Sequence, residues 1–243
     1  MDAPLQERPH GAELEQRLVE RYGDFGGVDL LRVMIKEEFP GRIAVTSSFG
    51  IEAAVLLDMV AEVDPSTPVI FLDTGMLFEE TLAYRDTLTK RFKLTDMRTV
   101  RPDPADIENY DADGALNRTD TETCCYLRKV LPLEKALHGF DAWITGRKRF
   151  HGGERADLRI VEFNNNRIKI NPLAGWSRGR IAEAYEKRSL PVHPLAAAGY
   201  TSVGCSPCTR LTGSGEEVRA GRWADMEKTE CGIHNAPWFG QGI

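Results

Sequence analysis

The chain has 243 residues, of which 42% are hydrophobic and 28% are charged, as is usual for soluble globular proteins. Its formal net charge of -6 argues against nucleic-acid binding driven by bulk positive charge. No apolar run is long enough to span a membrane, and residues 1–20 carry acids but lack the apolar segment of a secretory signal. We therefore expect a cytoplasmic protein that binds neither a membrane nor nucleic acid.

Predicted helices and strands alternate along the first part of the chain. Helices are expected at 12–22, 28–39, 51–63 and 78–92, the first two because apolar residues recur every three or four positions. Strands are expected between and after them, at 42–46, 68–72 and 96–100. This alternation predicts an α/β fold with a doubly wound, mostly parallel sheet, which binds ligands beyond the carboxyl ends of its strands.

The middle of the chain is expected to be less regular. Residues 102–119 are polar and predict irregular structure with at most a short helix. Thr121 or Thr123 is a candidate N-cap for a helix over 124–138. Three further elements are expected downstream: a strand at 141–145, a hairpin at 159–170 around three asparagines, and a helix at 177–188.

From Leu190 onward Pro, Gly and small residues dominate, which predicts loops that become ordered on a ligand or a partner. There is no internal repeat and no obvious linker. We therefore divide the chain into one domain, 1–215, and a flexible C-terminal tail, 216–243.

Two short motifs follow the first two predicted strands. Ser47-Ser48-Phe49-Gly50 lies between a strand and a helix, where small residues and the helix dipole favour a phosphate. It lacks the lysine of a Walker P-loop. Asp73-Thr74-Gly75 follows the next strand. A serine-glycine turn is common by itself, but the pair at neighbouring strand ends indicates an anion site.

Five cysteines form an unusual set. Cys124 and Cys125 are adjacent, Cys205 and Cys208 form a C-x-x-C pair, and Cys231 stands alone. Without a secretory signal, an odd number of paired and single cysteines indicates metal or redox chemistry rather than structural disulfides. Two pairs can hold a metal centre, which leaves one thiol for chemistry.

Cysteine-only ligation suits zinc or an iron-sulfur cluster. Adjacent helical residues project about 100° apart, so the Cys124-Cys125 pair reaches two corners of a cube more readily than one small ion. The adjacency favours a [4Fe-4S] cluster. The alternatives are a buried apolar Cys-Cys pair and a C-x-x-C that acts as a redox dithiol or as half of a zinc site.

Basic residues gather at three places. Lys129 lies four residues after Cys125, so a helix would put both on one face, where the cation could offset thiolate charge. Two loops carry further clusters, which suit a small polyanion: Arg147, Lys148, Arg149 and Arg155 in the first, and Arg219 and Arg222 in the second. Each cation could instead be a solvated surface residue.

Cys231 is the candidate nucleophile. It lies in Glu230-Cys231-Gly232-Ile233-His234, where nearby cations can lower a thiol pKa and the glycine allows close approach to a substrate. No pattern typical of a cysteine hydrolase is present, so we do not predict proteolysis.

The chain resembles the assimilatory adenylyl-sulfate (APS) reductases, relatives of the 3'-phospho-APS reductases, from about Arg42 to His234. The resemblance is carried by Ser47-Ser48-Phe49-Gly50, Leu72-Asp73-Thr74-Gly75, Cys124-Cys125, the first arginine loop, Gly204-Cys205-Ser206-Pro207-Cys208 and Glu230-Cys231-Gly232-Ile233-His234. It implies a PP-loop fold (adenine nucleotide α-hydrolase-like), with 1–215 as the nucleotide-binding reductase domain and 216–243 as the catalytic tail. The serine loop departs from the S-G-G-x-D-S form of ATP-splitting members.

The resemblance also implies a cofactor and a mechanism. Cys124, Cys125, Cys205 and Cys208 would hold one [4Fe-4S] cluster, and family members with this quartet generally use APS. Cys231 would attack the sulfur of APS and expel AMP, and thioredoxin or a glutaredoxin-like dithiol would free sulfite from the S-sulfocysteine. The implied substrate-binding residues are Ser47, Ser48, Phe49, Gly50, Asp73, Thr74, Gly75, Lys129, Arg155, Arg219, Arg222 and His234.

Three other functions remain open at this stage. The nearest is reduction of 3'-phospho-APS. The second, from another class, is a zinc-binding interaction or nucleic-acid module in which Cys231 is incidental. The third, a PP-loop component of a sulfate adenylyltransferase, is disfavoured by the departing serine loop. A homo-oligomer is compatible with each of them.

Overall fold

The computed structural model describes residues 11–224, 226 and 228–234. These residues form a six-stranded sheet in the order β3-β2-β1-β4-β6-β5. The strands are β1 (Ile43–Thr46), β2 (Val69–Leu72), β3 (Met97–Val100), β4 (Ala142–Ile144), β5 (Val161–Asn164) and β6 (Arg167–Ile170). Neighbouring strands pair in parallel except β5, which is antiparallel to β6. The predicted doubly wound, mostly parallel sheet is therefore confirmed.

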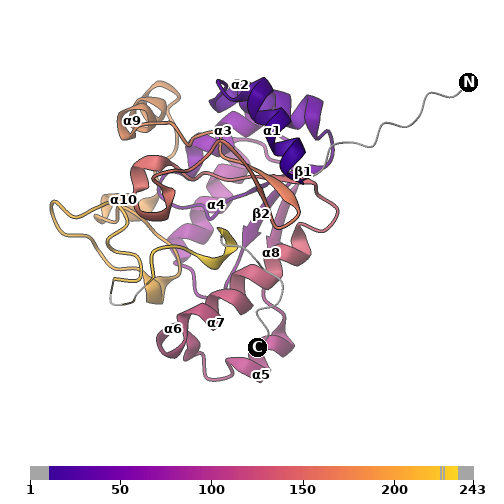
Figure 1. The fold of residues 1–243 in the computed structure, drawn as a ribbon. Coiled ribbons are helices and arrows are strands. Elements are labelled where there is room, and N and C mark those ends of the chain that lie inside the picture. Colours follow the sequence, from indigo (N-terminus) through magenta and orange to yellow (C-terminus); the bar gives the residue numbers. More distant parts are fainter. Residues whose placement is uncertain (1–10, 225, 227, 235–243) are drawn as a thin grey trace, which may run out of the picture.

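Helices cover both faces of this sheet (Figure 1). The larger core lies under α1 (Gly11–Tyr22), α2 (Gly27–Val33), α3 (Ala53–Val63), α4 (Glu79–Arg91) and α9 (Arg178–Lys187). The other face is covered by α8 (Leu131–Ala136). The remaining short helices are α5 (Pro104–Tyr110), α6 (Leu116–Thr119), α7 (Thr121–Cys125) and α10 (Pro194–Ala197). Within the described part of the chain, every helix is too short or too polar to cross a bilayer.

Strand residues alternate strictly between the two faces, as the period of two requires. Val45, Phe71 and Ile144 point into the larger core. Ala44, Ile70 and Trp143 point to the face covered by α8. Buried apolar side chains on both faces are typical of parallel sheets, which explains why these strands read as short continuous apolar runs.

The predicted hairpin is present, and its turn explains the asparagines. Asn165 and Asn166 have φ angles of 50° and 57°, the left-handed region that Asn tolerates better than most residues. β5 is thereby joined to β6 by a two-residue turn, and the antiparallel strand closes one edge of the sheet.

The helix around the adjacent cysteines differs from the prediction. Its N-cap is Asp120, whose carboxylate accepts from the N–H of Thr123, so neither Thr121 nor Thr123 is the cap. The helical path continues through a π-helical turn, Tyr126–Val130, into α8. Pro132 lies directly after that turn and has no N–H to continue the usual bonding pattern. Residues 102–119, expected to be irregular, contain both α5 and α6.

The long stretch after Leu190 is largely loop, as predicted. The division of the chain at 215 stays a prediction, and residues 1–10 and 235–243 of the two proposed parts lie outside the described residues. The described C-terminal turn packs against the π-helical turn of the cysteine segment, near the carboxyl ends of the strands (Figure 1).

His193 is a buried polar residue in this loop region. It is 0% exposed, its Nδ1 accepts from the N–H of Leu195, and its Nε2 lies 3.2 Å from Thr81 Oγ1. Burial lowers the pKa of His193 to about 4. The unfolded chain therefore binds more protons than the folded chain between pH 6.5 and 4, and stability falls as the pH falls through this window.

We predict that His193→Asn, which keeps an N-cap acceptor, loses less stability on acidification than the unchanged chain. The difference should approach about 1.4 kcal/mol per pH unit at most, since a single proton is involved. Urea unfolding at pH 7 and pH 5 measures it, with the exposed His138→Asn as the control. Identical pH slopes for His193→Asn and the unchanged chain would contradict the assignment.

Candidate active site

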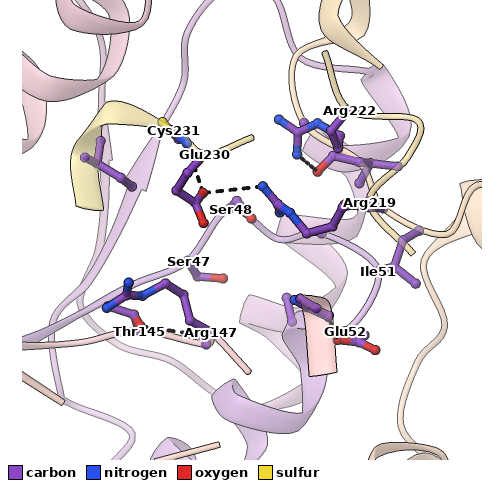
Figure 2. A pocket seen from close by; sticks show the side chains of 18 of the residues that line it. Ser47, Ser48, Ile51, Glu52, Thr145, Arg147, Arg219, Arg222, Glu230 and Cys231 are labelled. Atoms are coloured by element: carbon purple, nitrogen blue, oxygen red, sulfur yellow. Dashed lines mark hydrogen bonds and ion pairs between the residues drawn. The ribbon is translucent and has the colours of Figure 1, made fainter. Parts of the chain in front are cut away.

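A cavity opens at the carboxyl ends of β1, β2 and β4 and is closed on its far side by the C-terminal segment (Figure 2). Most of the lining residues come from the loops after these three strands and from the segment between Thr201 and His234, and Lys129 joins them from the π-helical turn. Parallel strands deliver their following loops to a single edge, so residues distant in sequence meet here.

The serine loop forms one wall. Ser47, Ser48 and Gly50 line the cavity, and Ser47 Oγ accepts from the N–H of Phe49 at 3.2 Å. Phe49 has a φ of 48°, and its ring packs against Phe71 in the core, 5.3 Å between centroids. Phe49 therefore anchors the loop from behind and does not line the cavity.

The Asp73-Thr74-Gly75 turn lies between the cavity and the cysteines. Thr74 lines the cavity, and its Oγ1 lies 3.3 Å from Cys205 Sγ. Asp73 and Gly75 do not line it. The Asp73 carboxylate accepts from the N–H of Gly75 and from Nε of Arg101, so it braces the turn.

All five cysteines lie in the described part of the chain, and none forms a disulfide. Cys124 and Cys125, from α7, are buried, as are Cys205 and Cys208. Burial raises the pKa of Cys124 to about 11, and the charges of Cys205, Asp111 and Cys208 act in the same direction. Among the described residues, no three Cys, His, Asp or Glu side chains converge on a single metal ion.

Two cations accompany the cysteine segment. Lys129 lines the cavity; burial would lower its pKa, but negative charge at Cys231, Cys205 and Cys125 raises it overall. Arg128 is buried and donates to the carbonyl oxygen of Thr74 at 3.0 Å. Its second partner is Asp111, at 2.6 Å. That Lys129 and Cys125 share a helix face stays a prediction, since Lys129 lies in the π-helical turn that follows α7.

Glu230 ties the C-terminal segment to the arginine loops. Its carboxylate accepts from Arg155 Nε at 2.5 Å and Nη2 at 2.9 Å, and Arg219 Nη2 lies 3.4 Å away (Figure 2). Burial would raise the pKa of Glu230, but the two guanidinium groups lower it to about 2. Glu230 Oε1 also accepts from the N–H of Cys231 at 2.9 Å, so the arginines position the backbone of the candidate nucleophile.

Arg222 packs into a site shaped by glycine. Its Nη1 donates to the carbonyl oxygen of Val203 at 3.0 Å, and its guanidinium lies over the ring of Trp223. A Cβ on Gly204 would overlap this guanidinium. Nε of Arg222 is buried and has no hydrogen-bond partner among residues 11–224, 226 and 228–234. Arg155, Arg219 and Arg222 all line the cavity.

A second polar chain runs along the cavity wall, and its pairings were not predicted from the sequence. Glu52 pairs with Lys148 at 2.8 Å and with Nε2 of His151 at 3.0 Å, and Nδ1 of His151 lies 3.1 Å from Arg155. Burial opposes ionisation of Glu52, but His151 and Lys148 lower its pKa to about 2. The chain continues from Arg155 to Glu230. Its partners lie far apart in sequence, so no local pattern singles them out.

Arg149, counted in the same basic cluster, differs from its neighbours. Its Nε donates to the carbonyl oxygen of Leu158 at 2.8 Å, and its side chain does not line the cavity. Arg147 and Lys148 do line it. Of the basic residues in this loop, Arg147, Lys148 and Arg155 therefore face the cavity, and Arg149 braces the loop.

Cys231 and His234 complete the cavity wall. The Cys231 thiol is half-buried and hydrogen-bonded to Cys125, which, with the charge of Lys129, lowers its pKa. Burial lowers the pKa of His234 well below its usual value, so the ring is neutral at pH 7. His234 Nδ1 is buried and lacks a partner within the described structure. The site thus presents a thiol, a neutral imidazole and several cations to one space.

A family model and several named proteins from bacteria match this chain. The family model described as phosphoadenosine phosphosulfate reductase domain matches residues 42–211. A protein named adenosine 5'-phosphosulfate reductase from Mesorhizobium japonicum is 46% identical, over 88% of this chain and 84% of its own length. Proteins of the same name from Chelativorans sp. and Mycolicibacterium smegmatis are 42% and 37% identical, over 93% and 91% of this chain and 94% of each relative.

Solved structures share the fold. The phosphoadenylyl-sulfate reductase of Candida auris, in a phosphate complex, aligns with a TM-score of 0.68 and 22% identity, over 83% of this chain and 98% of that one. Yeast FAD synthetase aligns with a TM-score of 0.53 and 15% identity, over 86% of this chain and 70% of its own. These likenesses confirm the expected PP-loop fold class. With the family match covering residues 42–211 and relatives of up to 46% identity along most of its length, the chain belongs to the phosphoadenosine phosphosulfate reductase family.

Proposed function

We propose that this protein reduces adenylyl sulfate (APS) to sulfite and AMP in sulfate assimilation, with thioredoxin or a glutaredoxin-like dithiol as reductant. The observation that carries the proposal is the position of Cys231, a half-buried thiol on the wall of a cavity that cations and two strand-end loops also line. Relatives of 37–46% identity named adenosine 5'-phosphosulfate reductase support APS as the substrate.

The nucleotide would lie along the strand ends. Ser47, Ser48, Gly50 and Thr74 offer hydroxyl and backbone groups there, at the edge where open α/β sheets bind ligands. Phe49, Asp73 and Gly75 act from behind, because they hold the two loops in shape and do not line the cavity.

The phosphosulfate would meet the cationic wall. Lys129, Arg155, Arg219 and Arg222 line the cavity and present positive charge to an anion. Burial and the neighbouring Arg155 lower the pKa of Arg219 to about 10, which leaves it charged at pH 7. The partnerless Nδ1 of His234, a neutral ring, supports a hydrogen bond from this residue to the substrate.

The proposed chemistry is two thiol displacements. The Cys231 thiolate bonds to the sulfonyl sulfur, the bond from that sulfur to the phosphate oxygen breaks, and AMP leaves with the electron pair. The cations stabilise the charge that moves onto the leaving phosphate. A dithiol then attacks Sγ of Cys231, sulfite leaves with the electron pair of the S–S bond, and the second thiol of the dithiol releases the enzyme as a free thiol. The dithiol is oxidised to a disulfide as the sulfate sulfur is reduced.

Cys124, Cys125, Cys205 and Cys208 would hold a [4Fe-4S] cluster. Four buried thiols in two pairs suit such a group by their chemistry, and cations at Arg128, Lys129 and Arg222 would offset its thiolate charge. When bound, the cluster would fix the two cysteine segments and set the local field.

Both displacement steps are carried by this chain's own groups and the external dithiol. Lys129 can orient the substrate sulfonate, and Glu230, held by Arg155 and Arg219, orients the backbone N–H of Cys231. Free thiols and a dithiol reductant suit a reducing compartment, so the proposal includes a cytoplasmic location.

We predict that Cys231→Ser abolishes sulfite release from APS with thioredoxin, by about 1000-fold or more, because a hydroxyl is a far weaker nucleophile and cannot be reduced afterwards. AMP binding should persist, since the change replaces one sulfur atom at the wall with oxygen. APS labelled with ³⁵S, given without reductant, should label the unchanged protein covalently and leave Cys231→Ser unlabelled.

The same assay with 3'-phospho-APS distinguishes the nearest alternative. Preference for the 3'-phosphorylated nucleotide, or full activity of Cys231→Ser, would overturn the proposal.

Arg219→Gln should reduce kcat/KM for APS about 100-fold, because the change removes a partly buried positive charge from the anion site. Arg159→Gln is the matched control: its side chain is 60% exposed and makes a surface ion pair with Glu15. Steady-state sulfite assays measure both. Equal losses in the two variants would show that charge at the cavity is not the cause.

Protein purified without oxygen should be brown and contain about four iron and four acid-labile sulfide atoms per chain. Cys208→Ser should lose most of both, because one of four ligands is removed. A colourless protein with one zinc per chain would support the zinc-binding alternative instead.

A further inference from the structure

A buried lysine lies beneath the C-terminal turn and outside the substrate cavity. Lys169, on β6, is 1% exposed, whereas its neighbours Ile168 and Ile170 point to the opposite face, into the larger core. Lys169 therefore lies on the face that carries Trp143, its register partner on β4. Its ammonium sits 5.0 Å from the centroid of the Trp143 ring, within reach of a cation–π interaction.

The turn that follows Cys231 packs on this pair. The ring of His234 stacks on Trp143, with centroids 5.7 Å apart and planes 8° from parallel. Lys169 Nζ donates to the carbonyl oxygen of His234 at 3.3 Å. Ile233 packs into the apolar cluster that includes Trp143 and Val130. Two consecutive side chains and one carbonyl of the turn thus contact the same small area of the sheet.

Among residues 11–224, 226 and 228–234, Lys169 forms no ion pair with a carboxylate, although the charges of Glu162 and Glu230 act on it. Glu162 is its register partner on β5, but that carboxylate accepts from Arg147 at 2.5 Å and from Asn171 at 2.9 Å. Within the described part of the chain, the hydrogen-bond acceptor of Lys169 is the tail carbonyl. Burial and the charge of Arg147 lower the pKa of Lys169 to about 7, so the site is costly for an ammonium unless the tail covers it with an acceptor.

The turn is short enough to transmit this contact to the nucleophile. The N–H of His234 donates to the carbonyl oxygen of Cys231 at 3.2 Å, which closes a 3-10 turn over Gly232–His234. A Cβ on Gly232 would lie 3.3 Å from Val130, so the turn sits close on the helix. Fixing the carbonyl and ring of His234 therefore fixes Cys231 within one turn.

We propose that Lys169 and Trp143 form the docking site of the catalytic tail, with Lys169 as the positioning residue that holds the Cys231 turn over the cavity. The inference rests on the proposed function, in which Cys231 is the nucleophile. The contacts of His234 with Lys169 and Trp143 attach the tail after Cys231, whereas the ion pairs of Glu230 attach it before Cys231. Losing Lys169 should therefore loosen the tail without emptying the anion site.

The test compares Lys169→Met, which keeps the apolar stem and removes the donor, with Lys169→Arg, which keeps a cationic donor. Both are made in the full chain and purified without oxygen. Lys169→Met should lower kcat for sulfite release about tenfold, with KM for APS and the Kd for AMP unchanged within about twofold. Lys169→Arg should recover much of the loss.

A second measurement does not depend on turnover. Trypsin should cut Lys169→Met after Lys228 about tenfold faster than the unchanged chain, because an undocked tail exposes a side chain that is 5% exposed when docked. Ile233→Ala, a change on the tail alone that cannot unfold the sheet, should give the same faster cleavage and lower kcat.

Cleavage rates and kcat at the level of the unchanged chain in both Lys169→Met and Ile233→Ala would overturn the proposal. A weaker AMP Kd with normal kcat in Lys169→Met would overturn it as well, since Lys169 would then belong to nucleotide binding. If no form of the protein released sulfite from APS, the proposed function would fail, while the cleavage rates would still decide the docking site.

Discussion

The architecture depends on one constraint, the point where the sheet changes direction between β1 and β4. From β1 the chain adds β2 and then β3 on one side, while β4 and the hairpin lie on the other. The loops after β1 and β4 consequently diverge and leave a crevice at the carboxyl edge. Ser47 and Ser48 enter it from one side and Arg147 and Lys148 from the other.

The crevice concentrates positive charge in a protein whose net charge is negative. Lys129, Arg147, Lys148, Arg155, Arg219 and Arg222 all line it, opposed by Glu52 and Glu230. The two carboxylates are held ionised by these cations, and neither is free to repel an anion, because each is already paired. Acidic residues on the surface make the net charge of the protein negative, whereas cations make the charge around the cavity positive. Net charge alone therefore says little about what the cavity binds.

Local features were predictable from the sequence, and long-range pairings were not. The alternation of helices and strands, the Asn165-Asn166 turn and the serine loop after β1 follow from periodicity and turn chemistry within a few residues. The cap at Asp120 was missed because two nearby threonines offered equally plausible caps. The π-helical turn was missed because apolar spacing hardly differs between π and α geometry over five residues.

The candidate site shows the same contrast between local features, which could be predicted, and long-range pairings, which could not. That four cysteines could act together was readable from their spacing, but the pairing of Glu230 with Arg155 joins positions 75 residues apart and leaves no local trace. Phe49 shows a limit of motifs. A motif gives a run of residues, and only the structure separates the side chains that face the cavity from the one that anchors the loop in the core. Lys169 lies in the predicted hairpin, and nothing in the local sequence indicates that its side chain is buried.

The ion pairs of Glu230 bear on the design of inhibitors. Because this carboxylate already takes Nε and Nη2 of Arg155 and approaches Arg219, an anionic compound can form a salt bridge with those donors only by displacing it. Displacement would release the segment that carries Cys231 and so present the thiol to the same compound. An anionic scaffold with a mildly electrophilic arm could exploit both events in sequence, first by exchange of counterions and then by covalent capture.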